Sequence, residues 1–168
     1  LHKDDKTYPF LKITLNEDFP RILLCRRILD DGAAYYGPYQ SSYDLKQLIM
    51  LLKDIFKLRS CNTSFEGDFK ERRPCLYYQL GKCRGVCCKS VGIDEYRPTI
   101  EEVIDFVNGK TSGIVQKITD EMKQASARLD FETAKTCRDR LRAIELIGQK
   151  QKIVNPNGDD TDAISVFN

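Results

Sequence analysis

The sequence is poor in the features that would assign it at once to a special class of protein. Gly and Pro together occupy only 16 of its 168 positions, which argues against a collagenous or low-complexity chain. No apolar run approaches the roughly 18 residues of a membrane-spanning helix, so we expect no membrane role. The 27 basic and 25 acidic residues give a net charge of +2. Any attraction to nucleic acid must therefore come from local clustering of charge.

Residues that could catalyse a reaction are also scarce. His2 is the only histidine, and no strand-borne pair of carboxylates and no nucleophile next to a base stands out. Asp159, Asp160 and Asp162 lie in a polar stretch typical of a solvated linker, rather than of a metal-binding carboxylate set. We expect this chain by itself to hydrolyse nothing.

Cysteine, by contrast, is abundant. Five of the seven cysteines fall between Cys61 and Cys88, and Cys25 and Cys137 stand alone in apolar-periodic segments. An odd count does not suit a complete disulfide framework. The chain starts at Leu1 without a secretory signal, and we take it to be a piece of a longer, cytoplasmic protein whose thiols stay reduced. Clustered thiols in such a compartment usually bind metal.

Alternating apolar residues predict three short strands, over residues 8–14, 21–29 and 34–36. Because the loops between them are short, we expect an antiparallel meander that places three basic residues on an exposed face or edge: Lys12, Arg26 and Arg27. A helix capped by Ser41 or Ser42 follows. Its apolar positions repeat at steps of three and four residues: Leu45, Leu48, Ile49, Leu52, Ile55 and Phe56.

Residues 57–92 then lose all periodicity. This segment is too long for an ordinary loop, so something other than a hydrophobic core must order it. The next helix ends at Asn108 and Gly109, and it begins either at Asp94, with an irregular first turn, or near Pro98. Two last helices, about residues 112–128 and 131–150, are antiparallel neighbours because only Leu129 and Asp130 join them.

These elements predict an α+β fold in two parts. Residues 1–111 form a small antiparallel sheet with packed helices around a four-cysteine site, and residues 112–152 form the helical hairpin. Residues 153–168 are a linker and the start of a following domain, with a strand at 163–167. Two helices alone leave half of the apolar seam of the hairpin exposed to solvent. The hairpin must therefore dock on the rest of the chain or on a partner.

The cysteine spacing predicts a metal centre. Four thiolates, from Cys61, Cys75, Cys83 and Cys87 with Cys88 as a substitute for its neighbour, can satisfy a tetrahedral zinc ion or an iron–sulfur cubane. Zinc sites usually use two close cysteine pairs, and this segment has only one. A cluster is wider than an ion and accepts ligands that are scattered along a loop. The spacing alone leaves zinc, an iron–sulfur cluster and reduced thiols without metal open.

The same segment is basic: residues 57–89 carry a net charge of +5 before any metal is counted. Basic and aromatic side chains in alternation suit a phosphate backbone and unstacked bases. The predicted DNA-binding residues are Arg59, Arg72, Arg73, Tyr77, Tyr78, Lys82, Arg84 and Lys89. In the alternative reading, the tyrosines pack round the metal and the arginines are solvated.

Several stretches occur in the order seen in the UvrC family of bacterial nucleotide excision repair, and the chain resembles that family over its whole length. They are KDDKTYPFLKIT, FPRILLCRR, YYGPY, LRSC, RPCLYYQLGKCRGVC and ASARLDFETAKTCRDRL. The resemblance implies a 4Fe–4S cluster on Cys61, Cys75, Cys83 and Cys87, with zinc as the alternative. Cys88 departs from the single cysteine that is usual at that place. Tyr35-Tyr36-Gly37 does not represent the GIY-YIG nuclease motif of the family.

The last helices resemble the UVR motif, through which UvrC docks on a matching hairpin of UvrB to make a four-helix bundle. Four residues would form the partner-binding surface: Leu129, Phe131, Ala134 and Leu141. Thr136 and Cys137 depart from the residues usual in the motif, and Phe131 could instead be an internal core contact. The resemblance thus implies a non-catalytic middle region of an excision nuclease, which binds UvrB and damaged double-stranded DNA and positions nuclease domains outside this piece.

Three other functions compete with this one. A zinc-binding adaptor with a UVR motif and no DNA role, like the activators of protein-arginine kinases, would carry repeated C-x2-C pairs, and this chain has none. A redox or radical enzyme with C-x3-C-x2-C would need a cysteine at Ser90. The third is an interaction module that binds no nucleic acid, and salt-dependent DNA binding would exclude it.

Overall fold

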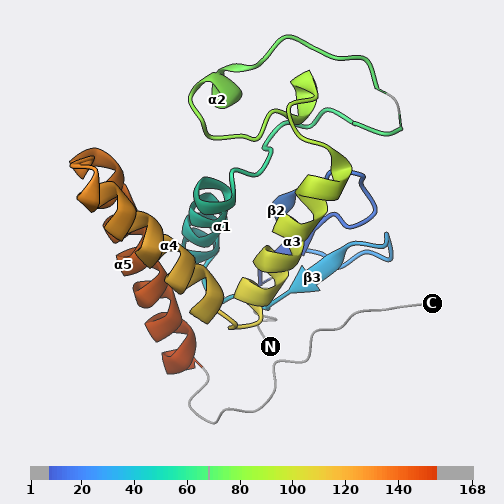
Figure 1. Cartoon of the computed structure of the whole chain (residues 1–168). Coiled ribbons are helices and arrows are strands. Elements are labelled where there is room, and N and C mark those ends of the chain that lie inside the picture. Colours follow the sequence, from blue (N-terminus) through green and yellow to red (C-terminus); the bar gives the residue numbers. More distant parts are fainter. Residues whose placement is uncertain (1–7, 68, 155–168) are drawn as a thin grey trace, which may run out of the picture. The chain divides into compact units, whose positions relative to one another are not determined.

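The computed structural model describes residues 8–67 and 69–154, with side chains described as far as Ile147 (Figure 1). These residues divide between Ile100 and Glu101 into two compact units. The predicted boundary, at residue 111, falls after the helix that this division interrupts. None of the described helices is both long and apolar enough to cross a membrane. The acidic residues at 159, 160 and 162 and the predicted strand at 163–167 lie outside the described residues.

The sheet has three antiparallel strands: β1 (Phe10–Ile13), β2 (Ile22–Cys25) and β3 (Ala34–Tyr36). Their order is β2-β1-β3, so the predicted meander is wrong. Leu11 and Ile13 of β1 are completely buried, and the central position lets this strand pair on both edges. The connection over residues 26–33 is long enough to carry the chain past β1 to its free edge.

Of the three basic residues predicted for an exposed face, Arg26 and Arg27 are exposed. Lys12 is half-buried. Its ammonium group pairs with Asp31, from the connection between β2 and β3, and lies 5.5 Å from the centre of the Tyr35 ring. This pair ties the connection to the central strand.

Helix α1 (Ser42–Phe56) covers the sheet, packing on β1 and β2. As predicted, Ser41 caps it, accepting a hydrogen bond from the Asp44 N–H group at 3.2 Å. The helix ends where Lys57 takes a left-handed conformation, with φ of 53°. Its predicted apolar positions are buried except Ile55, which is half-buried. Helix and sheet together form the main hydrophobic core of the first unit.

The described residues of the cysteine segment (residues 57–92) contain little regular structure, only α2 (Leu76–Gln79) and the 3-10 turn η1 (Val86–Cys88) (Figure 1). The prediction that something other than a hydrophobic core must order this segment is wrong at both ends. Phe65 is buried, with its ring edge-on to Phe19 at a centroid distance of 6.5 Å. Near the other end, Val86 and Val91 are buried. Residues 70–77, between these anchors, are exposed without interruption.

Helix α3 (Ile93–Val107) begins well before Pro98, so the alternative start at the proline is wrong. The Tyr96 N–H group already donates to the Gly92 carbonyl at 3.0 Å, and Pro98 in the second turn removes only one donor. The predicted stop is confirmed: Gly109 has φ of +85°, and the Lys110 N–H group reaches back to the Asp105 carbonyl at 2.8 Å. The chain then enters α4 (Ser112–Ala127) and α5 (Phe131–Val154).

Candidate functional site

The four predicted metal ligands lie in one neighbourhood of the cysteine segment, although they come from different turns of the chain. Burial raises the pKa of the Cys83 thiol, and the nearby sulfurs of Cys75 and Cys61 raise it further. Burial also raises the pKa of the Cys87 thiol, and the nearby Cys75 sulfur raises it further. Each sulfur is thus close enough to at least one other to influence its charge.

This donor set fits a metal centre chemically, because four soft sulfur ligands suit zinc or an iron–sulfur cluster. Partial burial opposes thiolate formation at Cys83 and Cys87, and a bound metal would supply the positive charge that stabilises thiolates. Among the described residues, no three His, Cys, Asp or Glu side chains converge closely enough to hold a single metal ion. The identity of the centre therefore stays a prediction.

The neighbouring thiols of Cys87 and Cys88 have different surroundings. The Cys88 sulfur donates to the Gly85 carbonyl at 3.3 Å and lies 3.2 Å from the Ser90 hydroxyl. The Cys87 sulfur instead lies near enough to Cys75, one of the other predicted ligands, for Cys75 to influence its pKa. This difference favours Cys87 over Cys88 as the fourth ligand.

Gly85 is a part of this site that the sequence analysis did not identify. It has φ of +79°, a conformation that residues with a side chain rarely adopt. A Cβ atom at this position would also lie 2.5 Å from the Tyr78 ring. The hydroxyl of Tyr78 accepts a hydrogen bond from Ser90 at 3.1 Å. The half-buried ring of Tyr78 thus packs against Gly85, between Cys83 and Cys87, whereas Tyr77 is exposed.

Most of the predicted DNA-binding residues are accessible. Arg72, Arg73, Tyr77, Lys82 and Lys89 are exposed, and the Lys89 ammonium group lies 5.3 Å from the centre of the Phe69 ring. Arg84 is half-buried instead. Its guanidinium group donates to the Glu95 carbonyl at 3.0 Å and to the Thr99 hydroxyl at 2.6 Å. Arg84 therefore holds the cysteine segment to the first turns of α3.

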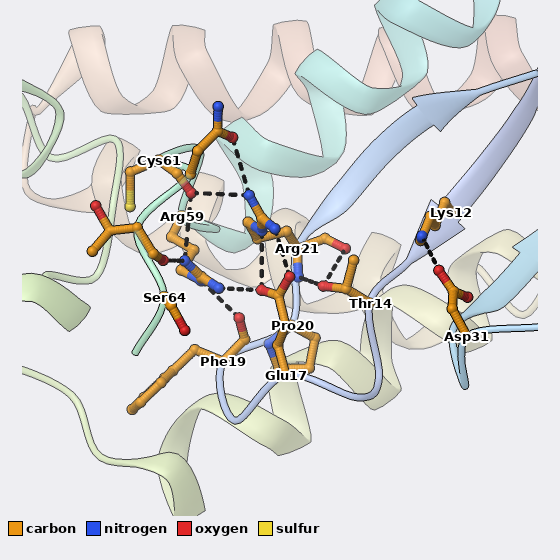
Figure 2. A network of polar contacts seen from close by, with 12 residues as sticks. Lys12, Thr14, Glu17, Phe19, Pro20, Arg21, Asp31, Arg59, Cys61 and Ser64 are labelled. Carbon is orange, nitrogen blue, oxygen red and sulfur yellow. Dashed lines mark hydrogen bonds and ion pairs between the residues drawn. The ribbon is translucent and has the colours of Figure 1, made fainter. Parts of the chain in front are cut away.

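The prediction for Arg59 is wrong, because this side chain is only 1% exposed. Its guanidinium group donates to the carbonyls of Phe19 and Thr63, both at 2.7 Å, and pairs with Glu17 (Figure 2). All of its nitrogens are thus used inside the protein. No local pattern in the sequence distinguishes Arg59 from the accessible basic residues of the segment, since two of its partners, Phe19 and Glu17, lie 40 and 42 positions away.

The predicted hairpin is confirmed, with α4 and α5 packed side by side (Figure 1). Its seam contains four buried residues: Ile118 and Ala125 of α4, and Cys137 and Ile144 of α5. In the turn, the N–H groups of Leu129 and Asp130 donate to the carbonyls of Ser126 and Ala125, the paired bonds of a Schellman motif. The Asp130 carboxylate caps α5, accepting from the Thr133 N–H group at 3.1 Å.

Two of the four predicted partner-binding residues, Leu129 and Phe131, lie at the turn end of the hairpin. Leu129 is 72% exposed and Phe131 65% exposed, whereas Ala134 and Leu141 are half-buried. Phe131 is therefore not an internal core contact, and that alternative is wrong. Leu129 has φ of 60°, at a position where Gly is usual. The hairpin thus keeps two large apolar side chains in water beside a well-ordered turn.

Two family models match successive parts of the chain. Residues 8–106 match the family model described as the middle domain of UvrC/Cho excinucleases, and residues 113–147 match the UvrB/uvrC motif. UvrABC system protein C of Thermoanaerobacter sp. (strain X514) is 40% identical over 166 residues, 99% of this chain. The corresponding protein of Clostridium botulinum (strain Hall) is 43% identical over 167 residues, also 99% of this chain.

These alignments cover 27% of each relative, so the chain spans about a quarter of the length of the curated proteins it matches. No solved structure matches it. The middle-domain match covers more than half of the chain, and the motif match covers the hairpin formed by α4 and α5. The chain therefore belongs to the UvrC family, of which it carries the middle domain and the UVR motif.

Proposed function

We propose that this chain is the non-catalytic positioning region of an excision nuclease that acts in nucleotide excision repair. Its hairpin docks on UvrB, and its cysteine segment holds a 4Fe–4S cluster and faces damaged double-stranded DNA. Nuclease domains elsewhere in the full-length protein then cut the damaged strand at set distances on both sides of the lesion. In this proposal, the hairpin and the cysteine segment position the nuclease domains and take no part in cutting DNA.

The observation that carries the proposal is the exposed apolar tip of the hairpin. Leu129 and Phe131 would bury their side chains if a second helical hairpin completed a four-helix bundle. Large aromatic residues at such interfaces commonly dominate the binding energy. The turn supports this role, because a leucine in a left-handed conformation is strained and glycine would relieve it. A strained, exposed leucine is best explained by a contact that the side chain makes with a partner.

The test is capture of purified UvrB by the wild-type chain and by Phe131→Ala. We expect the substitution to weaken binding by about tenfold or more, as for a central aromatic anchor. Tyr43→Ala is the matched control, because Tyr43 is a 69% exposed aromatic residue on α1, outside the hairpin. Equal capture by both variants and the wild type would contradict docking through this tip.

The DNA surface that we propose is narrower than the set predicted from sequence. Arg72, Arg73 and Lys82 are exposed and available for phosphates, and Tyr77 on α2 is 57% exposed beside them in sequence. Arg59, Arg84 and Tyr78 are excluded because their polar groups or rings are engaged within the protein. Between residues 70 and 89 the chain has six basic residues and one acidic residue, which favours a polyanionic partner.

A further inference from the structure

The first cysteine of the predicted metal centre is held by a network of charged side chains. Cys61 itself is exposed and lies in a stretch with neither helix nor strand. Its carbonyl accepts hydrogen bonds from two guanidinium groups, those of Arg21 and Arg59, each at 3.4 Å. Arg21 also donates to the side chain of the next residue, Asn62, at 3.0 Å (Figure 2). The backbone at Cys61 is thus fixed by side chains and not by regular structure.

Glu17 joins the two arginines. One of its carboxylate oxygens pairs with Arg59 and also accepts from Nε of Arg21 at 3.0 Å, while the other accepts from Nη2 of Arg21 at 2.5 Å. Glu17 belongs to the turn between β1 and β2, more than forty positions before Cys61. It is the acidic partner of a guanidinium group that is almost completely buried. Loss of its charge would leave Arg59 buried without a counter-ion, which proteins tolerate poorly.

Helix α3 closes the network from the other side. The buried hydroxyl of Tyr96 accepts from the Arg59 N–H group at 3.1 Å and donates to the Pro20 carbonyl at 3.2 Å. The Tyr96 ring meets Phe19 edge-on at a centroid distance of 5.5 Å. The turn after β1, the chain after α1 and the first turns of α3 therefore meet at Arg59. The cysteine segment enters its irregular course directly from this junction.

We propose that Glu17, Arg21 and Arg59 are positioning residues that hold Cys61 in place for the metal centre. This inference rests on the proposed cysteine centre, and the three residues touch no metal themselves. Hydrogen-bonding partners outside the ligands orient them in metal sites, and their loss commonly costs ten- to a hundredfold in metal affinity.

The test compares Glu17→Gln with Asp31→Asn in the full chain, purified without oxygen. Asp31 is a matched control because it is also a half-buried carboxylate paired with a cation in the same unit, yet its side-chain partners are Lys12 (Figure 2) and Tyr35 of the sheet, not the arginines around Cys61. We expect Glu17→Gln to lose the absorbance of the metal centre to an iron chelator about ten- to a hundredfold faster than the wild type. Asp31→Asn should lose it at the wild-type rate.

Equal rates in both variants would overturn the inference. If Glu17→Gln does not fold, Arg21→Lys replaces it, because lysine keeps the charge but not the fork that joins Glu17 to the Cys61 carbonyl. If the wild type binds no metal, the proposed centre itself fails, and alkylation of Cys61 measured against Cys75 becomes the readout. Faster alkylation of Cys61 in Glu17→Gln alone would then support the positioning role, and unchanged alkylation would refute it.

Discussion

Two adjacent thiols of the same chemistry have different partners. Cys87 lies near Cys75, which influences its pKa, whereas Cys88 is hydrogen-bonded to the Gly85 carbonyl and lies beside the Ser90 hydroxyl. We expect Cys87→Ser to abolish the metal centre and Cys88→Ser to retain it. Visible absorbance together with iron, sulfide and zinc content of oxygen-free protein measures both outcomes, and near four irons and four sulfides per chain are expected in Cys88→Ser.

The reverse result, with metal lost only from Cys88→Ser, would exchange the roles of the two thiols. Colourless wild-type protein with one zinc ion per chain would instead move the cysteine segment to a structural zinc role. The UVR hairpin would remain in that case, and a zinc-binding adaptor without a DNA role would become the better interpretation.

The basic side chains show that residue type alone does not predict the role of a residue. Arg59, Arg72 and Arg84 all stand in the same basic stretch, yet the first is buried, the second exposed and the third bonded to α3. All three are arginines in one basic stretch, so neither their charge nor their position along the chain distinguishes them. The difference lies in carbonyls and carboxylates that belong to distant segments. The prediction that Arg59 contacts DNA is therefore wrong, and DNA contacts by the exposed basic residues stay a prediction.

At the scale of the element, one carboxylate, that of Asp130, caps helix α5 at the turn of the hairpin. Bonds from the Thr133 side chain and N–H group lower the pKa of Asp130 below its ordinary value. A lowered pKa means that this cap stabilises α5 above the unfolded-state pKa of about 4, and that the contribution is lost as pH falls through the folded-state pKa. We expect Asp130→Ala to weaken UvrB capture at pH 7, by less than Phe131→Ala does.

Asp130→Asn provides the control for charge, because asparagine caps helices as well as aspartate but does not titrate near pH 4. Helix content followed by circular dichroism should fall between pH 6 and pH 3 by more in the wild type than in Asp130→Asn. An identical fall in both proteins would show that Asp130 does not stabilise α5 through its charge.

The elements with strong periodicity were predicted well, because burial of one face determines them locally. Helix α1, the end of α3 and the whole hairpin follow from apolar spacing and caps within each segment. The order of the strands was not predictable in this way. Each strand is only three or four residues long, and the pairing of β3 with β1 rather than with β2 depends on the sheet as a whole.

At the scale of the whole molecule, local clustering outweighs a net charge of only +2. We expect the combined variant Arg72→Ala, Arg73→Ala and Lys82→Ala to weaken duplex binding at low salt, because these exposed cations can reach phosphates. In a salt series, log K falls as log salt rises, and each phosphate contact that is lost should make this negative slope shallower by about 0.9. Fluorescence anisotropy with a labelled duplex measures both effects.

The matched control removes three exposed cations from elsewhere in the first unit, those of Arg26, Arg27 and Lys46. It lowers the net charge by the same amount and should leave the salt slope close to that of the wild type. If this control weakens binding and the first variant does not, the DNA surface lies on the sheet side of the unit and not on the cysteine segment.

The sequence by itself determined the α+β class, the hairpin, the cysteine segment and the resemblance to UvrC proteins, because spacing, caps and motifs are local properties. Only the tertiary structure decided the strand order, the burial of Arg59, the difference between Cys87 and Cys88 and the exposure of Phe131. The strand order and the burial of Arg59 depend on contacts with residues that lie far away in the sequence. Cys87 and Cys88 differ because the side chains of adjacent residues have different surroundings. Local sequence patterns do not identify such partners, because these contacts form only when the chain folds.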